Sequence, residues 1–410
     1  MNRTGIMLVA GDPSGDANAA DLVRELAGAV PAAQFQITND LQPLTAPLAP
    51  AFFGAGGPKM AAAGVELVCD LTAHAVIGLG GLFKKLPMLR RLMDELLRLA
   101  IERQPELIIL VDYGGFNLRL ARAIKDFVRA RTGPFFQWHP KIVQFISPQV
   151  WASRPGRAKK MARDYDLVLT LFPFEKEWFA SRVPQLPVEF VGHPIFDRYP
   201  FPRPASTPAG HNAGRPVVLL LPGSRQGELR RHVPVMRDAA VLIANRQRAQ
   251  FKMVVPDQTL AGIARSLLPA GQSRISLQVG GLEEALCSAS VAITKTGTIT
   301  LECAYFGVPA VALYKTDWIT YLGGRHLVSV DYLSMPNLLA GEPIYPEFIQ
   351  GRATAANIAD AASLILANPR QRLRVQEKLA AAIRSLGGPG AARRAAAAVV
   401  KLLRGNPTVS

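Results

Sequence analysis

The chain has 410 residues, which is long for a single hydrophobic core, so two domains are the natural expectation. Hydrophobic residues make up 49% and charged residues 19% of the sequence, a composition typical of globular proteins that excludes a disordered chain. The net charge of +16 favours an anionic partner, such as nucleic acid, an anionic membrane surface or a phosphorylated substrate.

The cysteines and the N-terminus bear on the compartment. Cys69, Cys287 and Cys303 are scattered and show neither metal-ligand spacing nor a disulfide framework, which predicts a reducing environment and no bound metal. The N-terminus enters a strand directly, so we expect no signal peptide. No run of about 18 apolar residues predicts a membrane span.

Short apolar runs recur along the chain, separated by segments of helical periodicity. The expected strands of a first series are Ile6–Ala10, Phe35–Thr38, Ala51–Gly54, Leu107–Val111, Ile142–Ile146, Leu167–Leu171 and Val188–Val191. Those of a second series are Val217–Leu221, Phe251–Val255, Ile275–Gln278, Val291–Thr294 and Ala310–Leu313. Continuous apolar runs that alternate with helices are typical of parallel strands buried on both faces. The pattern predicts an α/β protein with two doubly wound, Rossmann-like domains.

A break without periodicity separates the two series. Residues 203–215 are rich in Pro, Gly and Ala, and we interpret them as the interdomain linker. The first domain is then expected over residues 1–202 and the second over residues 216–368. Residues 369–410 are Ala-rich and predict two C-terminal helices that cross back to the first domain. Such a crossing would permit exchange between the protomers of a homodimer.

The first expected strand ends in a turn of small residues, which include Asp12, Ser14, Gly15 and Asp16. Small residues let a backbone approach a ligand closely, and Ser14 or Asp16 can cap the helix that the pattern predicts from Ala17. A simple strand-to-helix turn is the alternative. The spacing is not that of the dinucleotide-binding fingerprint.

Asp112 follows the expected strand Leu107–Val111. A carboxylate at the C-terminal edge of a parallel sheet is partly buried, which raises its pKa towards the range of a general base. The alternative is an aspartate that caps the next helix.

Three more polar or aromatic side chains follow expected strands in the first series. Ser147 and Trp151 could shape a sugar or acyl pocket, although a core tryptophan is an equal alternative. His193 lies at a predicted cleft edge, where a structural histidine is the alternative.

Two loops in the second series suit an anionic ligand. Gly223, Ser224 and Arg225 follow a strictly apolar strand, so the backbone N–H groups and one guanidinium could bind a diphosphate. A second loop contains the residues Thr296, Gly297 and Thr298 and opens a helix. Glu302 on that helix could accept hydrogen bonds from a ribose, or simply stabilise the helix N-terminus. Two such loops make a nucleotide the leading ligand.

The segment before residue 100 contains a candidate membrane patch. Residues 86–100 form an amphipathic pattern that a core-facing helix also explains. Just upstream, apolar side chains are flanked by lysines, as a membrane-surface patch requires. The patch consists of Leu79, Leu82, Phe83, Lys84 and Lys85.

Along nearly its whole length the chain resembles the lipid-A-disaccharide synthase family, a glycosyltransferase family 19 type. The matching stretches are AGDPSGD (Ala10–Asp16), GAGGPKM (Gly54–Met60), VDYGGFN (Val111–Asn117), SPQVWA (Ser147–Ala152), LFPFE (Leu171–Glu175), FVGHP (Phe190–Pro194), LLPGSRQGE (Leu220–Glu228), GTITLE (Gly297–Glu302) and PNLLAG (Pro336–Gly341). Each stretch is a weak signal, but nine of them in the family's order are highly specific.

The resemblance implies a two-domain glycosyltransferase B fold with the active site in the interdomain cleft. It implies an inverting, metal-independent hexosyl transfer without a cofactor, from UDP-2,3-diacylglucosamine to 2,3-diacylglucosamine 1-phosphate (lipid X). The product would be the β-1,6-linked disaccharide 1-phosphate of lipid A biosynthesis, a step towards lipopolysaccharide. The enzyme would be cytoplasmic and peripheral on the cytoplasmic face of the inner membrane, whose anionic surface suits the basic chain.

Residue by residue, the resemblance assigns Asp112 as the general base and Arg225 as the essential arginine of the donor loop. It places Glu302 at the ribose and matches Asn337 to the asparagine of PNLLAG, on the donor side. The acceptor side is expected to include Asp12, Ser14, Gly15, Asp16, Ser147, Trp151 and His193.

The chain departs from the family pattern mainly in its first half. Asp12 stands where Glu is usual, Gly115 where a second Asp is usual, and Gly81 where Glu is usual. Residues 39–50, with three prolines, form an apparent insertion that we expect to be a surface loop. Nucleotide binding is therefore better supported than the identity of the acceptor.

Alternatives remain open at this point. A muramyl-lipid N-acetylglucosaminyltransferase and a UDP-sugar 2-epimerase share the expected fold. A non-catalytic protein that binds a nucleotide sugar or an anionic lipid is a different class, kept open by the missing acidic residues at 81 and 115. Nucleic-acid binding is suggested only by charge and lacks a basic aromatic motif, so we expect no nucleic-acid partner.

Overall fold

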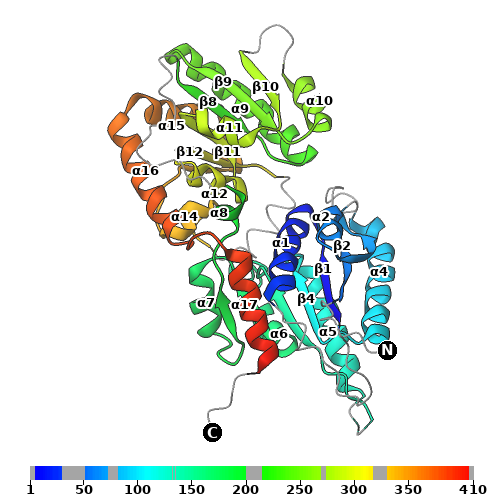
Figure 1. The fold of residues 1–410 in the computed structure, drawn as a ribbon. Coiled ribbons are helices and arrows are strands. Elements are labelled where there is room, and N and C mark those ends of the chain that lie inside the picture. Colours follow the sequence, from blue (N-terminus) through cyan, green and yellow to red (C-terminus); the bar gives the residue numbers. More distant parts are fainter. Residues whose placement is uncertain are drawn as a thin grey trace. The chain divides into compact units, whose positions relative to one another are not determined.

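The computed structural model describes residues 5–29, 51–72, 82–131, 133, 135–199, 215–268, 274–316 and 330–405, with the side chains of 82–86 left out. The chain divides into two compact units (Figure 1). Unit 1 comprises Met1–Asp197 and Gly388–Ser410, and unit 2 comprises Arg198–Gly387. The boundary falls a few residues before the predicted linker, of which residues 203–214 lie outside the described part.

Unit 1 is built around a parallel sheet with seven strands among the described residues, in the order β3-β2-β1-β4-β5-β6-β7. The strands are β1 Gly5–Ala10, β2 Ala51–Gly56, β3 Glu66–Asp70, β4 Leu107–Val111, β5 Lys141–Phe145, β6 Leu167–Thr170 and β7 Val188–Phe190. The helices are α1 Pro13–Ala29, α2 Pro58–Ala62, α4 Leu82–Arg103, α5 Gly114–Arg129, α6 Arg157–Asp164, α7 Pro173–Ala180, α8 Ile195–Arg198 and α17 Ala391–Arg404. Every residue of β1 and β4 is buried, which explains why these strands are continuous apolar runs.

Unit 2 contains a six-stranded parallel sheet in its described part, in the order β10-β9-β8-β11-β12-β13. The strands are β8 Val217–Leu221, β9 Gln250–Val255, β10 Ile275–Val279, β11 Val291–Lys295, β12 Ala310–Tyr314 and β13 Glu347–Ile349. The helices are α9 Gln226–Arg246, α10 Gln258–Leu267, α11 Leu282–Ser288, α12 Thr298–Tyr305, α14 Met335–Ala340, the 3-10 helix Gln350–Arg352, α15 Ala355–Ala367 and α16 Pro369–Arg384. The prediction of two doubly wound α/β domains is confirmed.

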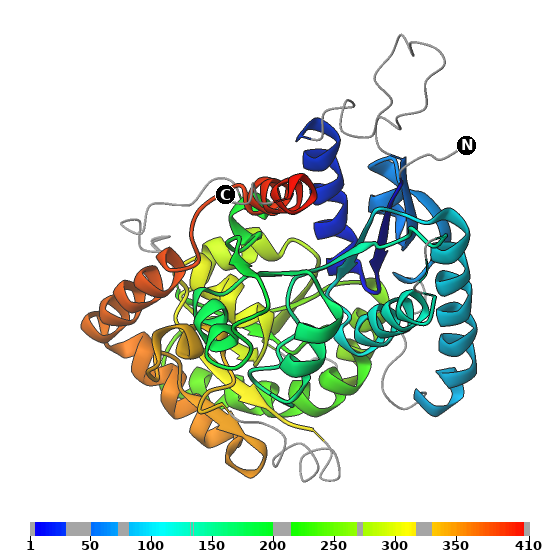
Figure 2. The ribbon, with the colours of Figure 1, turned by 90° about the horizontal axis from the view of Figure 1, so that it is seen from below.

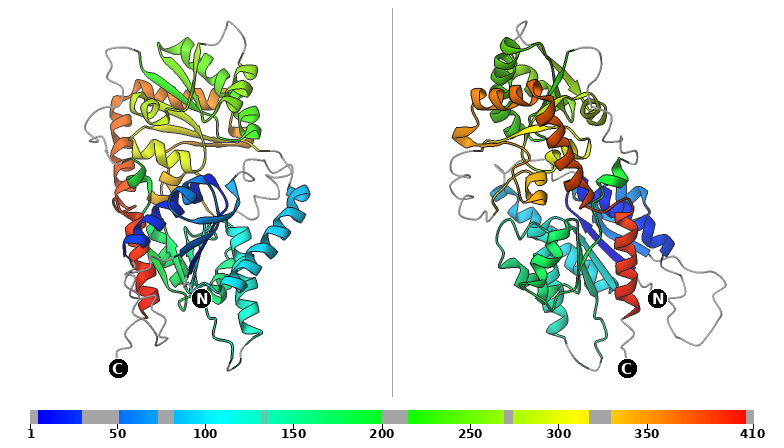
Figure 3. Two further views of the ribbon diagram at one scale, coloured as in Figure 1. Left: turned by 45° about the vertical axis from the view of Figure 1, so that its right-hand side comes forward. Right: turned by 90° about the vertical axis from the view of Figure 1, so that its left-hand side faces the viewer.

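The two C-terminal helices belong to different units, so residues 369–410 do not join the first domain as one segment. Helix α16 packs against α12, α14 and α15 of unit 2 (Figure 3). Helix α17 packs against α1 of unit 1, and the two lie side by side in Figure 2. Asp197 fixes the start of α17, because its carboxylate accepts hydrogen bonds from the N–H groups of Gly390 (2.6 Å) and Ala391 (3.0 Å). The glycine-rich break at residues 387–390 is thus the point where the chain returns to unit 1.

Each sheet reverses its winding direction at one point, between β1 and β4 in unit 1 and between β8 and β11 in unit 2. In open α/β sheets, ligands bind outside the carboxyl ends of the strands at such a switch point. Asp12 and Asp112 follow β1 and β4, while Ser224 and Thr296 follow β8 and β11. The strand order therefore gathers the predicted residues into one cluster per unit.

Candidate active site

Asp112 stands in a strained turn at the end of β4. Asp112 and its neighbour Tyr113 have φ angles of 47° and 43°, in the left-handed region that favours glycine. The Asp112 carbonyl accepts hydrogen bonds from Asn117 Nδ2 (2.9 Å) and Gln144 Nε2 (3.1 Å). The N-cap of α5 is Tyr113 and has no side-chain cap, so the Asp112 carboxylate does not cap that helix. The turn instead fixes the Asp112 backbone and leaves its carboxylate for another use.

The Asp112 carboxyl is a weaker acid than an ordinary aspartate. Burial, followed by the negative charge of Asp12, raises its pKa to about 6, and a hydrogen bond from the Tyr113 backbone partly opposes this shift. The ends of β1 and β4 also touch directly, since a Cβ on Gly11 would lie 2.3 Å from the Tyr113 ring. Close packing at the switch point therefore brings the two carboxylates near enough to interact.

The acidic residues of the first turn have roles other than those predicted. Helix α1 begins at Pro13 rather than at Ala17, and Asp12 caps it by accepting a hydrogen bond from Gly15 N (2.6 Å). Asp16 is buried and instead accepts hydrogen bonds from the N–H groups of Gly57, Lys59 and Met60. Asp16 thus holds the start of α2, which sequence reasoning could not pair with it. Ser14 is exposed on the first turn of α1.

Replacing Asp16 with alanine is expected to lower the free energy of unfolding of unit 1 by about 2–4 kcal/mol, because three N–H groups lose a charged acceptor. Asp16→Asn, which keeps one acceptor oxygen, should cost less. Urea denaturation followed by tryptophan fluorescence suits the test, since Trp138, Trp151 and Trp178 all lie in unit 1. Equal stability of wild type and Asp16→Ala would contradict the assignment.

The other predicted residues of unit 1 bind within the protein. Trp151 is buried, and its Nε1 donates to the buried Glu175 (3.0 Å), whose pKa burial raises to about 7. The Ser147 hydroxyl donates to the Pro148 carbonyl (3.2 Å). His193 Nδ1 accepts from the Ile195 N–H (3.1 Å). These contacts shape the loops after β5 and β7, and an acceptor-side role for the three residues stays a prediction.

Glu228 organises the first loop of unit 2. Gly223 has a φ of 128°, and a Cβ there would lie 2.2 Å from Glu228 Oε2. The same oxygen accepts a hydrogen bond from the Ser224 N–H (3.0 Å). The other oxygen, Oε1, pairs with Lys295 Nζ at 3.2 Å. Glu228 therefore ties the loop after β8 to the end of β11, across the switch point.

Arg225 occupies the N-cap position of α9, and its side chain is 71% exposed. Its recorded ion pair, with Glu228, is long at 3.9 Å. The guanidinium is thus anchored at a helix N-terminus and held only weakly by the protein, an arrangement that suits an anionic ligand.

A pocket of about 300 Å³ opens at the carboxyl ends of β8, β9 and β11. Its apolar lining residues are Leu221, Val254, Val255, Pro256, Leu282 and Ile299. Its remaining lining residues are Gly223, Ser224, Gly280, Lys295, Thr298 and Glu302. The pocket thus combines an apolar wall, which suits a flat ring, with small loops, a cation and a carboxylate. This combination matches the parts of a nucleotide.

Glu302 contributes a carboxylate to this pocket and is ion-paired inside unit 2. Burial raises the pKa of Glu302, while the charge of Arg198, whose Nη1 lies 2.9 Å from Oε1, opposes the rise. Gly297, with a φ of 112°, is the N-cap of α12, and the Thr300 hydroxyl donates to its carbonyl (2.6 Å). Thr296 is buried behind Thr298, the residue of this loop that lines the pocket.

Asn337 has all four of its amide hydrogen bonds within the protein. Nδ2 donates to the Tyr345 carbonyl and to Glu347 Oε1, and Oδ1 accepts from the N–H groups of Ile344 and Tyr345. In this state the Asn337 amide has no hydrogen-bonding group left for a sugar donor. Asn337 positions the segment between α14 and β13, and its place on the donor side stays a prediction.

Sequence reasoning missed several residues that build the site. Gln144 donates from one amide nitrogen to the carbonyls of Asp112 and Ile146 (3.1 Å each). His232 joins the ends of two strands of unit 2, with Nδ1 on the Pro222 carbonyl (2.6 Å) and Nε2 accepting from Lys315 N (3.2 Å). Each of these links connects two strands that are distant in sequence, so no local pattern signals it.

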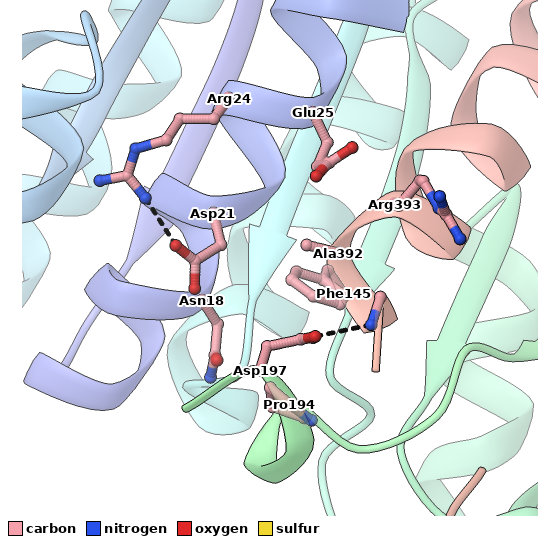
Figure 4. A pocket seen from close by; sticks show the side chains of 10 residues that line it. Asn18, Asp21, Arg24, Glu25, Phe145, Pro194, Asp197, Ala392 and Arg393 are labelled. Atoms are coloured by element: carbon pink, nitrogen blue, oxygen red, sulfur yellow. Dashed lines mark hydrogen bonds and ion pairs between the residues drawn. The ribbon is translucent and has the colours of Figure 1, made fainter. Parts of the chain in front are cut away.

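A second pocket, of about 250 Å³, lies within unit 1 where α1, α8 and the start of α17 meet (Figure 4). Asp21 pairs with Arg24 there (2.6 Å), and Asp197 accepts from the Gly390 N–H (Figure 4). None of the predicted site residues lines this pocket.

The profile of the lipid-A-disaccharide synthetase family matches residues 6–402. The chain belongs to this family. Lipid-A-disaccharide synthase of Geobacter sulfurreducens is 35% identical over 405 residues, which cover 97% of each chain. The enzyme of the same name from Myxococcus xanthus is 33% identical over 408 residues, 98% of each chain. The family is one of glycosyltransferases in lipid A biosynthesis, and this membership decides among the alternatives that the sequence left open.

Solved structures of low sequence identity share the fold. A UDP-bound structure of MnaA from S. aureus gives a TM-score of 0.60 at 12% identity, covering 98% of this chain and 97% of the other. MurG of Acinetobacter baumannii gives a TM-score of 0.54 at 13% identity, covering 97% and 99%. These likenesses show the two-domain α/β architecture of GT-B glycosyltransferases and UDP-sugar epimerases.

The candidate membrane patch lies largely outside the residues that the structure describes. Leu79 falls outside the described residues, as does Gly81, and only the backbone of residues 82–85 is described, as the first turn of α4. The predicted strand Phe35–Thr38 and the loop 39–50 also fall outside. Among the helices that the structure describes, none has the length and apolar character needed to cross a bilayer.

Proposed function

We propose that the chain joins UDP-2,3-diacylglucosamine to 2,3-diacylglucosamine 1-phosphate and releases UDP and the β-1,6-linked disaccharide 1-phosphate. Family membership supports the reaction class, and the two site clusters support a division of labour. In this proposal Asp112 of unit 1 acts on the acceptor. In unit 2, the pocket and the neighbouring Arg225 bind the UDP-sugar.

The observation that carries the proposal is the Asp112 carboxyl, held by a strained turn with a pKa of about 6. At pH 7 such a group is mostly ionised, yet it is a stronger base than an ordinary aspartate. Asp112 takes the proton of the acceptor 6-hydroxyl while that oxygen bonds to the donor's anomeric carbon. The bond from this carbon to the diphosphate breaks on the opposite side, so the configuration inverts and UDP leaves with the electron pair.

The donor side neutralises the charge that develops on the leaving diphosphate. Arg225, Lys295 and the N–H groups at the starts of α9 and α12 supply positive potential to the leaving diphosphate. On this basis we propose that the transfer needs neither a metal ion nor a cofactor. The apolar wall of the pocket would receive the uracil ring, and Glu302 the ribose.

We further propose that the enzyme works at the cytoplasmic face of the inner membrane, because both proposed substrates carry acyl chains. The net charge of +16 suits an anionic lipid surface. The patch of Leu79, Leu82, Phe83, Lys84 and Lys85 remains the proposed contact, and a homodimer remains a prediction.

The activity is expected to fall about tenfold per pH unit below about pH 6, since Asp112 must be deprotonated to act as a base. A pH profile of kcat/KM for the acceptor measures this midpoint. A sugar phosphate also titrates near pH 6, so titration of Asp112 must be distinguished from titration of the substrate. Burial is the larger cause of the raised Asp112 pKa, and Asp12→Asn removes the smaller cause, the charge of Asp12, so the midpoint should move part of the way to lower pH. A midpoint that stays in place would assign it to the substrate.

Product analysis tests the reaction itself. The purified full chain is incubated with both proposed substrates in mixed micelles containing EDTA. A tetraacyl disaccharide 1-phosphate and UDP support the proposal, including its independence of metal. Saturable UDP binding without product would mean that the acceptor is assigned wrongly.

A further inference from the structure

Three arginines lie on the elements that follow β4 and β5 of unit 1. Arg119 lies on α5, Arg154 in the loop between β5 and α6, and Arg157 is the first residue of α6. Helices α5 and α6 pack against each other, and Arg154 and Arg157 belong to one turn, so the three residues come from adjoining elements. Burial, followed by the positive charges of Arg154 and Arg119, lowers the pKa of Arg157. We call this set the arginine cluster.

Among the described residues the cluster has no acidic partner, unlike its neighbours on the same helices. Arg122, Arg129 and Arg163 all form ion pairs with Asp164. No carboxylate of the described residues lies within ion-pair distance of Arg119, Arg154 or Arg157. Like charges held together without a counter-charge repel one another, so this arrangement is stabilised when an anion binds.

The cluster belongs to the same edge of the sheet as Asp112. Strands β4 and β5 are paired up to Val111 and Phe145, and the loops that follow them touch. A Cβ on Gly114 would lie 2.5 Å from Pro148 Cβ, so the start of α5 packs directly on the loop that carries Arg154. Arg154 has a φ of 61°, and its carbonyl accepts a hydrogen bond from Arg157 N (3.0 Å). This strained turn links the two arginines locally.

We propose that Arg119, Arg154 and Arg157 form the subsite that binds the phosphate monoester of the sugar acceptor. The inference rests on the proposed function. A dianionic phosphate matches several guanidinium groups, each of which can donate two parallel hydrogen bonds to its oxygens. The phosphate sits on C1 and the reacting hydroxyl on C6, at opposite ends of one sugar. A subsite that flanks the Asp112 turn would therefore hold the acceptor with its hydroxyl towards the base.

The test compares two acceptors, 2,3-diacylglucosamine with and without its 1-phosphate. For Arg157→Gln and Arg119→Gln, kcat/KM should fall roughly 10- to 100-fold with the phosphorylated acceptor. It should change little with the acceptor that lacks phosphate, and the Kd of UDP should be unaffected. Lys159→Gln is the matched control, because it removes one exposed charge from the same helix two residues away, on a different face. Equal losses with both acceptors, or no loss with either, would overturn the proposal.

A binding measurement separates this inference from the proposed reaction. Calorimetry with glucosamine 1-phosphate, on wild type and Arg157→Gln, requires no turnover. Binding that weakens in the variant supports the subsite even if wild type forms no disaccharide, and binding that is equal or absent refutes it. Sedimentation with anionic phospholipid vesicles tests the other source of phosphate. If the arginine variants lose vesicle binding but keep the wild-type preference for the phosphorylated acceptor, the cluster is a lipid-surface contact and the proposal is wrong.

Discussion

Replacing Asp112 with asparagine is expected to lower kcat by about 10²- to 10⁴-fold and to leave donor binding nearly unchanged. The amide cannot take the proton of the acceptor hydroxyl, whereas the pocket proposed for the UDP-sugar is lined entirely by residues of unit 2. Asparagine suits position 112 because it tolerates a left-handed backbone, so the φ of 47° adds little strain in the variant. Steady-state kinetics and the Kd of UDP give the two quantities.

Asp126→Asn provides the control for this experiment. It makes the same chemical change at a carboxylate of unit 1 that is 48% exposed and paired with Arg122 and Arg129 on α5. Its kcat should stay within about twofold of wild type, since exposed ion pairs contribute little. If Asp112→Asn retained near-normal turnover with an unchanged melting temperature, Asp112 would not be the base.

The strands with complete burial were all predictable, whereas only some of the partly buried edge strands were, such as β7 and β10. Continuous apolar runs identified β1 and β4, because both faces of these central strands are covered. The sequence analysis missed β3 and β13, which lie at the edges of their sheets and are only partly buried. Short edge strands carry mixed polar and apolar residues, so the hydrophobic pattern marks them less reliably than the central strands.

The sequence predicted which site residues follow strands, but not the hydrogen bonds and ion pairs that connect them. The sequence placed Asp112 and Arg225 after apolar strands, but it contains no information on which strands are neighbours. The partners Gln144, Glu228 and Lys295 act across strand pairs, so their roles depend on the strand order.

The roles of individual polar residues were harder still to predict. Asp12 and Asp16 lie four residues apart in one motif, yet one caps α1 and the other α2. Asn337 belongs to a motif that indicates a ligand, yet its amide forms hydrogen bonds with the backbone of Tyr345. Residue type and motif therefore predict that a side chain matters, while the tertiary hydrogen bonds decide what it does.

Replacing Arg225 with alanine is expected to lower kcat by about 10²- to 10³-fold, as does the loss of one preorganised donor to a developing anion. The reason is local: Arg225 occupies the N-cap position of α9 beside the Gly223-Ser224 loop, and the only ion pair that its exposed guanidinium forms among the described residues is a long one of 3.9 Å with Glu228. The effect should appear more strongly in kcat than in the Kd of the donor, because charge on the diphosphate grows as UDP departs. Arg225→Lys should recover only part of the rate, since an ammonium group cannot bind two oxygens in parallel.

Arg230→Ala is the matched control, an equal loss of charge at an exposed position of the same helix. It should leave kcat within about twofold of wild type if the effect at 225 comes from contact with the diphosphate and not from the general field of the helix. Equal losses in the two variants would show that unit 2 acts on the donor through net charge alone. A loss confined to Arg225→Ala would show that the leaving diphosphate is stabilised at the start of α9. This is the same loop in which Glu228 contacts Gly223 and binds the Ser224 N–H.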